Sequence, residues 1–159
     1  YENDKYEGMA TTMVSSFIHK NAAYITNIGD SRGYLFREGE LFQIPRDHTY
    51  VNELLLTGQI TEKEAETHEE KHMITRAIGS TDTVETDIFK VELEERDIML
   101  LCTDGLYGEI DNETIRGILD KNAPLHMKCE DLIENANANG GKDNITIALL
   151  QIDKEDIYE

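Results

Sequence analysis

An uninterrupted apolar run, Ile98 to Cys102, constrains the fold of this chain more than any other feature of its sequence. The run leaves no polar face for solvent and is too short for a typical helix, so it predicts a strand that is buried on both faces. Asp104 and Gly105 follow almost directly. The sequence therefore predicts an interior strand that ends in a polar turn.

Strand-like and helix-like patterns divide the rest of the chain. Residues 9–44 are rich in β-branched and aromatic side chains, which predicts an antiparallel meander. Residues 49–73 are polar and predict a helical insertion, whose second helix begins with capping-box spacing at Thr61. The last strand is expected to be buried, and the tail after Asp153 to be frayed. We expect strands at residues 9–18, 22–28, 33–37, 41–44, 87–91, 97–103 and 144–152, and helices at residues 50–56, 112–121 and 124–138.

The charge balance and the cysteine content limit the partners and the location of the protein. The 159 residues carry 33 acidic and 15 basic side chains, a net charge of −18 that disfavours nucleic acid and anionic membranes as partners. No apolar run approaches the roughly 20 residues of a membrane span, and the opening residues are too polar for a signal peptide. Two cysteines, Cys102 and Cys129, are too few for a disulfide framework. We therefore expect one reduced, cytoplasmic domain.

Three aspartates stand at the ends of predicted strands. Asp30 and Asp104 each follow a strand, and Asp143 precedes the last one. If the last strand runs antiparallel to the other two, the three carboxylates gather at one edge, where they would attract hard divalent ions such as Mg²⁺ or Mn²⁺. Gly-Asp, Asp-Gly and Asp-Asn are also ordinary turn dipeptides. The spacing alone leaves a metal site and a set of structural turns both open.

Other residues suggest chemistry with less support. His68 and His72 match the His-Glu-x-x-His pattern of zinc proteases, but their polar surroundings favour a solvated helix face. A zinc protease therefore stays a distant third hypothesis. His48 is more consistent with a structural hydrogen bond than with a general acid. Cys102 lies in the apolar run and is expected to be an inert, buried thiol.

Seven short motifs follow one another in an order and spacing that are highly specific. They resemble those of the metal-dependent protein phosphatases of the PPM, or type 2C, family in its small bacterial form. The resemblance runs from about Gly8 to Ile152. The motifs are GMATT (residues 8–12), GDSR (29–32), DHT (47–49), VNEL (51–54), TRAIG (75–79), TDGL (103–106) and GGKDNIT (140–146).

The resemblance implies a set of metal ligands. Asp104 and Asp143 match the aspartates that hold the family's catalytic pair of Mn²⁺ or Mg²⁺ ions. Asp30 matches the residue that holds a third, weaker ion together with Asp104. Asn144 and Gly105 correspond to positions beside these ligands. No catalytic residue beyond the metal ligands is implied within this sequence.

The resemblance also implies an α+β fold, an α-β-β-α sandwich of two antiparallel sheets. Residues 1–159 would form a single partial phosphatase domain, with residues 49–73 as a mobile flap beside the active site. The family pattern opens with a phosphate-binding arginine, a bridging aspartate, strands and a long helix that have no match in these residues. We therefore expect little turnover by this chain alone, and a need for that N-terminal segment or for a pairing partner. Ala10 and Glu69 depart from the usual motifs.

The resulting functional prediction is a bacterial protein serine/threonine phosphatase. It would hydrolyse phosphoserine and phosphothreonine by attack of a metal-bridging hydroxide, and its substrates would be phosphoproteins made by a serine/threonine kinase. The alternative is a non-catalytic regulatory or scaffolding module that kept the fold. Retention of Asp30, Asp104 and Asp143 favours activity, because a scaffold does not need crowded carboxylates.

Overall fold

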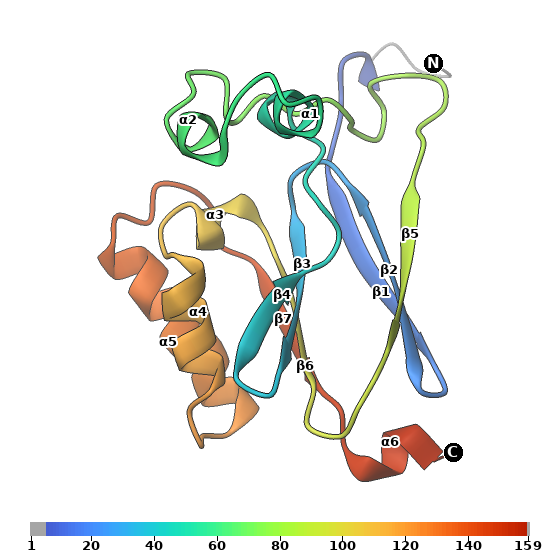
Figure 1. Cartoon of the computed structure of the whole chain (residues 1–159), viewed down its shortest axis with the longest axis vertical. Helices are drawn as coiled ribbons and strands as arrows, with labels where there is room; N and C mark the ends of the chain where they lie inside the picture. The colour runs from blue at the N-terminus through green and yellow to red at the C-terminus, as the bar shows by residue number, and fades with distance from the viewer. Residues whose placement is uncertain (1–5, 159) are drawn as a thin grey trace.

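Two antiparallel sheets packed face to face form the centre of the computed structural model, which describes residues 6–158 (Figure 1). One sheet has three strands in the order β1-β2-β5, and the other has four in the order β4-β3-β6-β7. The strands are β1 (Met13–His19), β2 (Ala22–Ile28), β3 (Arg32–Arg37), β4 (Glu40–Gln43), β5 (Asp87–Glu92), β6 (Ile98–Cys102) and β7 (Ile147–Gln151). The helices are α1 (Tyr50–Leu56), α2 (Glu62–Glu66), α3 (Asp104–Tyr107), α4 (Asn112–Leu119), α5 (Leu125–Ala138) and α6 (Lys154–Tyr158).

The interior strand predicted from the apolar run is confirmed. Met99 of β6 faces the three-stranded sheet and packs with Ile25 and Leu35 in one core. Leu100, the next residue, faces the other way and packs beneath α4 and α5 in a second core with Leu132. Successive side chains of a strand point to opposite faces, so β6 supplies both cores at once.

Helices α3, α4 and α5 lie beside the four-stranded sheet. Figure 1 shows α4 and α5 along its outer face, with α3 at its upper end. Helix α4 begins at residue 112 as predicted, and the Asp111 carboxylate caps it by accepting a hydrogen bond of 2.8 Å from the Thr114 amide. The predicted α+β fold with two antiparallel sheets is therefore confirmed, with one outer helical layer in the described part of the chain. None of the described helices has the length and hydrophobicity needed to cross a membrane.

The predicted meander at residues 9–44 is wrong. The hairpins β1-β2 and β3-β4 lie in different sheets, and the chain crosses between the sheets at residues 29–31. Gly29 makes this crossing with φ +102°, and a Cβ there would collide with the side chain of Thr12. Alternating apolar residues indicate a strand but not its sheet, which is why the sequence did not reveal the crossing.

The end of the chain also differs from the prediction. Strand β7 lies at the edge of its sheet and alternates between half-buried and exposed residues, so it is not a buried strand. Leu150, for example, is exposed. Residues 154–158 form the short helix α6 in place of a frayed tail. An edge strand has one neighbour only, and its apolar sequence does not distinguish it from a central strand.

Candidate metal centre

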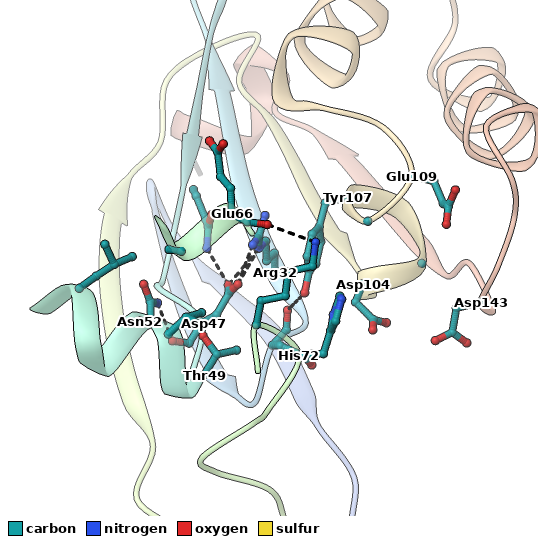
Figure 2. A pocket seen from close by; sticks show the side chains of 18 of the residues that line it. Arg32, Asp47, Thr49, Asn52, Glu66, His72, Asp104, Tyr107, Glu109 and Asp143 are labelled. Atoms are coloured by element: carbon teal, nitrogen blue, oxygen red, sulfur yellow. Dashed lines mark hydrogen bonds and ion pairs between the residues drawn. The ribbon is translucent and has the colours of Figure 1, made fainter. Parts of the chain in front are cut away.

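The three predicted aspartates lie at one end of the sandwich. Asp104 is in the first turn of α3, directly after β6, and Asp143 is in the loop before β7. Strands β6 and β7 are antiparallel with Cys102 opposite Ile147, so the end of one meets the start of the other. Asp30 reaches the same place from the crossing between the sheets. All three line one cavity of about 980 Å³. Asp104 and Asp143 are labelled in Figure 2. The antiparallel pairing of β7 with β6 agrees with the arrangement expected from the sequence.

A small hydrogen-bond network fixes α3 against the loop that carries Asp143. Thr103 and Thr146 bind each other, through the Thr103 amide to the Thr146 carbonyl (3.1 Å) and the Thr146 amide to the Thr103 hydroxyl (3.0 Å). The same hydroxyl donates to the Asn144 carbonyl at 3.1 Å. A Cβ on Gly105 would collide with that carbonyl oxygen. Glycine at this position therefore allows the close approach of α3 and the loop.

The cavity concentrates negative charge around Asp30. Burial, reinforced by the nearby Asp104 carboxylate, raises the pKa of Asp30 above its ordinary value. The Tyr107 hydroxyl donates a hydrogen bond of 2.7 Å to the Asp30 carbonyl and so orients this turn. A cation in the cavity would offset the repulsion between the two carboxylates.

The donor chemistry of the cavity fits a hard divalent ion, but the ligand set is incomplete. Carboxylate oxygens are the ligands that Mg²⁺ and Mn²⁺ prefer, and Mg²⁺ commonly binds through one or two carboxylates and keeps several waters. Within residues 6–158, no group of three or more histidine, cysteine, aspartate or glutamate side chains is close enough to hold a metal. Asp30, Asp104 and Asp143 can therefore supply part of a coordination shell, with positions left for other ligands.

An ion pair that the sequence reasoning did not assign forms one wall of the cavity. Arg32 Nη2 and Nε donate to Asp47 at 2.7 and 2.9 Å, and Arg32 Nη1 donates to the Tyr34 hydroxyl at 3.0 Å. The guanidinium also lies 3.5 Å from the centre of the Tyr107 ring. Burial alone would lower the pKa of Arg32, but the bonds with Asp47 raise it above its ordinary value. The charge of Arg32 is thus already paired inside the protein. The motifs GDSR and DHT contain both partners, yet nothing in their spacing shows that they meet.

The two ends of the polar insertion lie next to each other and are joined by backbone hydrogen bonds. Thr49 pairs with Ile74 in an antiparallel bridge, and the Tyr50 amide donates to the Met73 carbonyl at 2.9 Å. Between these points the chain forms α1 and α2, which lie at the same end of the sandwich as α3 (Figure 1). The capping box at Thr61 is confirmed. The insertion lines the cavity with Thr49, Val51, Asn52, Leu55, Glu62, Ala65, Glu66, Lys71 and His72.

His48 has the structural role expected for it. Its Nδ1 accepts a hydrogen bond of 3.3 Å from the Gly29 amide, and its Nε2 lies 3.0 Å from an Asp87 carboxylate oxygen. Because Nδ1 accepts, Nε2 carries the proton that bonds to Asp87. This bond, together with nearby Arg76, lowers the pKa of Asp87. His48 therefore ties the crossing between the sheets to the start of β5.

The zinc-protease pattern is not formed. Helix α2 ends at Glu66, and residues 67–72 are turns, so the two histidines do not share a helix face. The His68 Nδ1 accepts a hydrogen bond of 3.1 Å from the Glu70 amide, and its ring packs edge-on against Tyr50. His72 alone of the pair lines the cavity. A zinc site through both histidines is therefore wrong for this structure.

The cysteine of the apolar run is inert, as expected from the sequence. Cys102 is buried in β6, and burial raises the pKa of its thiol to about 12. A thiol with so high a pKa is almost entirely protonated near neutral pH, and the thiolate is the nucleophilic form. Its expected role as a buried, unreactive side chain is confirmed.

The fold is shared with bacterial serine/threonine phosphatases of known structure. Stp1 from Staphylococcus aureus matches with a TM-score of 0.90 and 38% identity, over 96% of this chain and 60% of Stp1. The catalytic domain of the phosphatase PstP, solved in complex with two manganese ions, matches with a TM-score of 0.80 and 38% identity, over 92% of this chain and 61% of that domain. These structures define the class: protein serine/threonine phosphatases.

The family follows from the sequence match. The profile of protein phosphatase 2C matches residues 1–149, and the chain belongs to that family. The phosphatase PhpP of Streptococcus pneumoniae is 44% identical over 155 residues, which are 98% of this chain and 63% of PhpP. The phosphatase Stp of Listeria monocytogenes is 40% identical over 92% of this chain and 58% of its own length. The chain thus spans about three fifths of these relatives.

Proposed function

We propose that the protein is a metal-dependent protein phosphatase that hydrolyses phosphoserine and phosphothreonine in bacterial phosphoproteins made by a serine/threonine kinase. One observation carries the proposal: Asp30, Asp104 and Asp143 line a single cavity at the end of a protein phosphatase 2C fold. Stp, Stp1 and PstP are serine/threonine phosphatases, and PstP was crystallised with two manganese ions, which supports the choice of ion.

In this proposal the aspartates divide the metal ions between them. Asp104 and Asp143 hold the catalytic pair of Mn²⁺ or Mg²⁺ ions, and Asp30 holds a third ion with Asp104. When bound, such ions supply an activated hydroxide and neutralise charge on the phosphoryl group. The protein contributes positioning, because the Thr103–Thr146 pairing holds the loop of Asp143 beside the first turn of α3.

The experiment joins residues 1–159 to the opening segment of pneumococcal PhpP, to which the family resemblance assigns the bridging aspartate and the phosphate-binding arginine. We expect the fusion to release phosphate from a phosphothreonine peptide in Mn²⁺ and not in chelator. Residues 1–159 alone are expected to show little turnover.

Variants of the fusion test the assigned ligands. Asp104→Asn and Asp143→Asn should each lower kcat at least about 100-fold, because each removes a charged ligand from the transition-state site. Asp82→Asn, in an exposed loop away from the cavity, is the matched control and should leave kcat unchanged. Activity that survives both ligand substitutions, or a fusion that folds and has no Mn²⁺-dependent activity, would contradict the proposal.

A regulatory or scaffolding module is the second candidate. It is favoured by the incomplete ligand set, since no three metal-ligating side chains come together in the described residues. A scaffold would bind a phosphoprotein through the same cavity without releasing phosphate. The fusion separates the two, because restoring the opening segment should restore turnover only to a phosphatase.

A further inference from the structure

A second hollow of about 710 Å³ adjoins the metal cavity beside α1 and α2. The two hollows have six lining residues in common, so they lie side by side. The shared wall consists of Arg32, Gln43, Asp47, Asn52, Leu55 and Glu62. We call the second hollow the flanking groove.

The shared wall is held rigidly by hydrogen bonds that centre on Asp47. Its carboxylate accepts from Arg32 and, at 2.7 Å, from the Gln43 side chain. Its carbonyl accepts from the Asn52 side chain at 2.7 Å. These groups are satisfied within the protein and leave little capacity for a ligand. Recognition in the flanking groove must therefore come from its other residues.

Those other residues are apolar on one side. Leu56 and Ile60 line the groove beside Leu55 of the shared wall, where α1 ends and the chain turns toward α2. Leu56 is 65% exposed, which is unusual for a leucine beside a polar rim. An apolar side chain lying in the groove would cover this surface and be stabilised by its burial.

The far part of the groove carries an unpaired positive charge. Arg46 lines only the flanking groove, is exposed, and forms no ion pair with any residue from 6 to 158. This is notable because the chain has 33 acidic residues that could have paired with it. Glu62 lines both hollows and so lies where they adjoin, whereas Arg46 lines the flanking groove alone. An acidic group of a ligand would therefore be attracted to the Arg46 side of the groove.

We propose that the flanking groove binds the substrate residues next to the phosphorylated one, and that it selects an apolar side chain at Leu55 and Leu56 and an acidic side chain at Arg46. The inference rests on the proposed function, because the metal cavity must receive the phosphorylated residue for the groove to receive its neighbours. It names the substrate class: phosphopeptides in which apolar and acidic residues flank the phosphorylated one.

The test is a binding measurement, so that it does not depend on turnover. Fluorescent peptides carry a non-hydrolysable phosphonate in place of the phosphothreonine phosphate, and place one leucine and one aspartate at varied distances on either side. Their affinity for the protein is measured by anisotropy with and without Mn²⁺. We expect the peptide with one particular spacing of leucine and aspartate to bind about tenfold more tightly than the same peptide with alanines at both positions.

Two variants and a control assign the effect to the groove. Arg46→Glu should remove the preference for aspartate, with a loss of about fivefold, and leave the preference for leucine. Leu56→Asp should do the reverse, and its exposure means that the fold should be retained. Lys63→Glu is the matched control, because Lys63 is an exposed cation on α2 that does not line the groove. It should change neither preference.

The outcomes separate this inference from the proposed function. If the peptides bind with the predicted pattern while the fusion protein releases no phosphate, the proposed role of the groove is supported and the proposed phosphatase activity is overturned. If the fusion protein is active but substitutions of Arg46 and Leu56 leave the peptide affinities unchanged, the proposed role of the groove is overturned and the phosphatase proposal stands. A preference for basic flanking residues, or self-association that Leu56→Asp abolishes without changing peptide affinity, would also overturn it.

Discussion

The two sheets of this protein differ in what covers them. The four-stranded sheet is covered on both faces, by the other sheet and by α4 and α5, and its core includes fully buried Leu100 and Leu132. The three-stranded sheet carries Phe17, Tyr24 and Ile88 on its outer face, where no described helix lies (Figure 1). Stability is therefore expected to reside mainly in the covered sheet.

The position of the candidate ligands follows this difference. Asp104 and Asp143 flank β6 and β7 of the covered sheet, whereas Asp30 lies in the crossing between the two sheets. Ligands placed next to well-packed strands keep their geometry better than ligands on isolated loops. We expect Asp104 and Asp143 to be more rigidly positioned than Asp30.

The largest expected effect tests the comparison directly. Leu132→Ala removes a fully buried side chain from α5 and should lower the free energy of unfolding by about 2–5 kcal/mol. Ile88→Ala removes a side chain that is 68% exposed on the uncovered face and should cost about 0.5 kcal/mol. Urea unfolding of both variants measures the difference. Equal losses would show that the outer face is covered in solution.

A second test concerns the far end of the molecule, where an ion pair links β3 to the segment after β5. Asp97 is 1% exposed and accepts from Arg37 Nη2 at 2.6 Å and from the Glu94 amide at 2.8 Å. Asp97→Asn removes a buried charge that has two partners and should cost about 2–3 kcal/mol. The exposed pair Lys121–Asp131 is the control, and Asp131→Asn should cost less than about 1 kcal/mol. Similar losses for both pairs would contradict the role of burial.

The crossing between the sheets should respond to pH in a defined direction. Asp30 has a raised pKa in the folded protein, so its ionisation costs stability above that pKa, and the cost disappears as pH falls below the unfolded value of about 4. The Asp30→Asn variant should therefore be more stable than the wild type near neutral pH and equally stable near about pH 3. The difference near neutral pH should be less than about 1 kcal/mol, because solvent screens a half-buried group. Thermal unfolding across pH checks this. Added Mn²⁺ should narrow or reverse the difference, and an Asn variant that is less stable at every pH would refute it.

The smallest global effect is expected in the insertion. Thr61→Ala removes the hydroxyl that accepts a 3.3 Å hydrogen bond from the Glu64 amide at the start of α2. Because α2 has no buried residue, we expect a change in global stability below about 0.5 kcal/mol but faster hydrogen exchange in α2. Mass spectrometry resolves this segment. Unchanged exchange would mean that the rest of the insertion holds α2 in place without its cap.

Most helices and strands could be predicted from residues that are close together in the sequence. The apolar run predicted β6 and Thr61 predicted the start of α2, because burial and capping depend on residues close together in the chain. Contacts between distant segments were not predictable in this way. One such contact is the close packing of Gly29 against Thr12, at the point where the chain crosses from one sheet to the other.

The candidate site shows the same division. Asp30, Asp104 and Asp143 could be found because each follows or precedes a recognisable strand, and the family resemblance then gave them roles. The pairing of Arg32 with Asp47 and its contact with Tyr107 were not found, since no periodic pattern links these positions. Charge pairing across loops needs the three-dimensional arrangement.

The backbone pairing that closes the insertion has a consequence for how this domain can diverge. Thr49 and Ile74 sit opposite each other, so everything between them leaves and re-enters the domain at one point. Residues can be added, lost or exchanged inside such a loop at low entropic cost and without shifting the register of the strands on either side. The insertion can therefore change in length or sequence while the strands next to Asp30, Asp104 and Asp143 keep their positions.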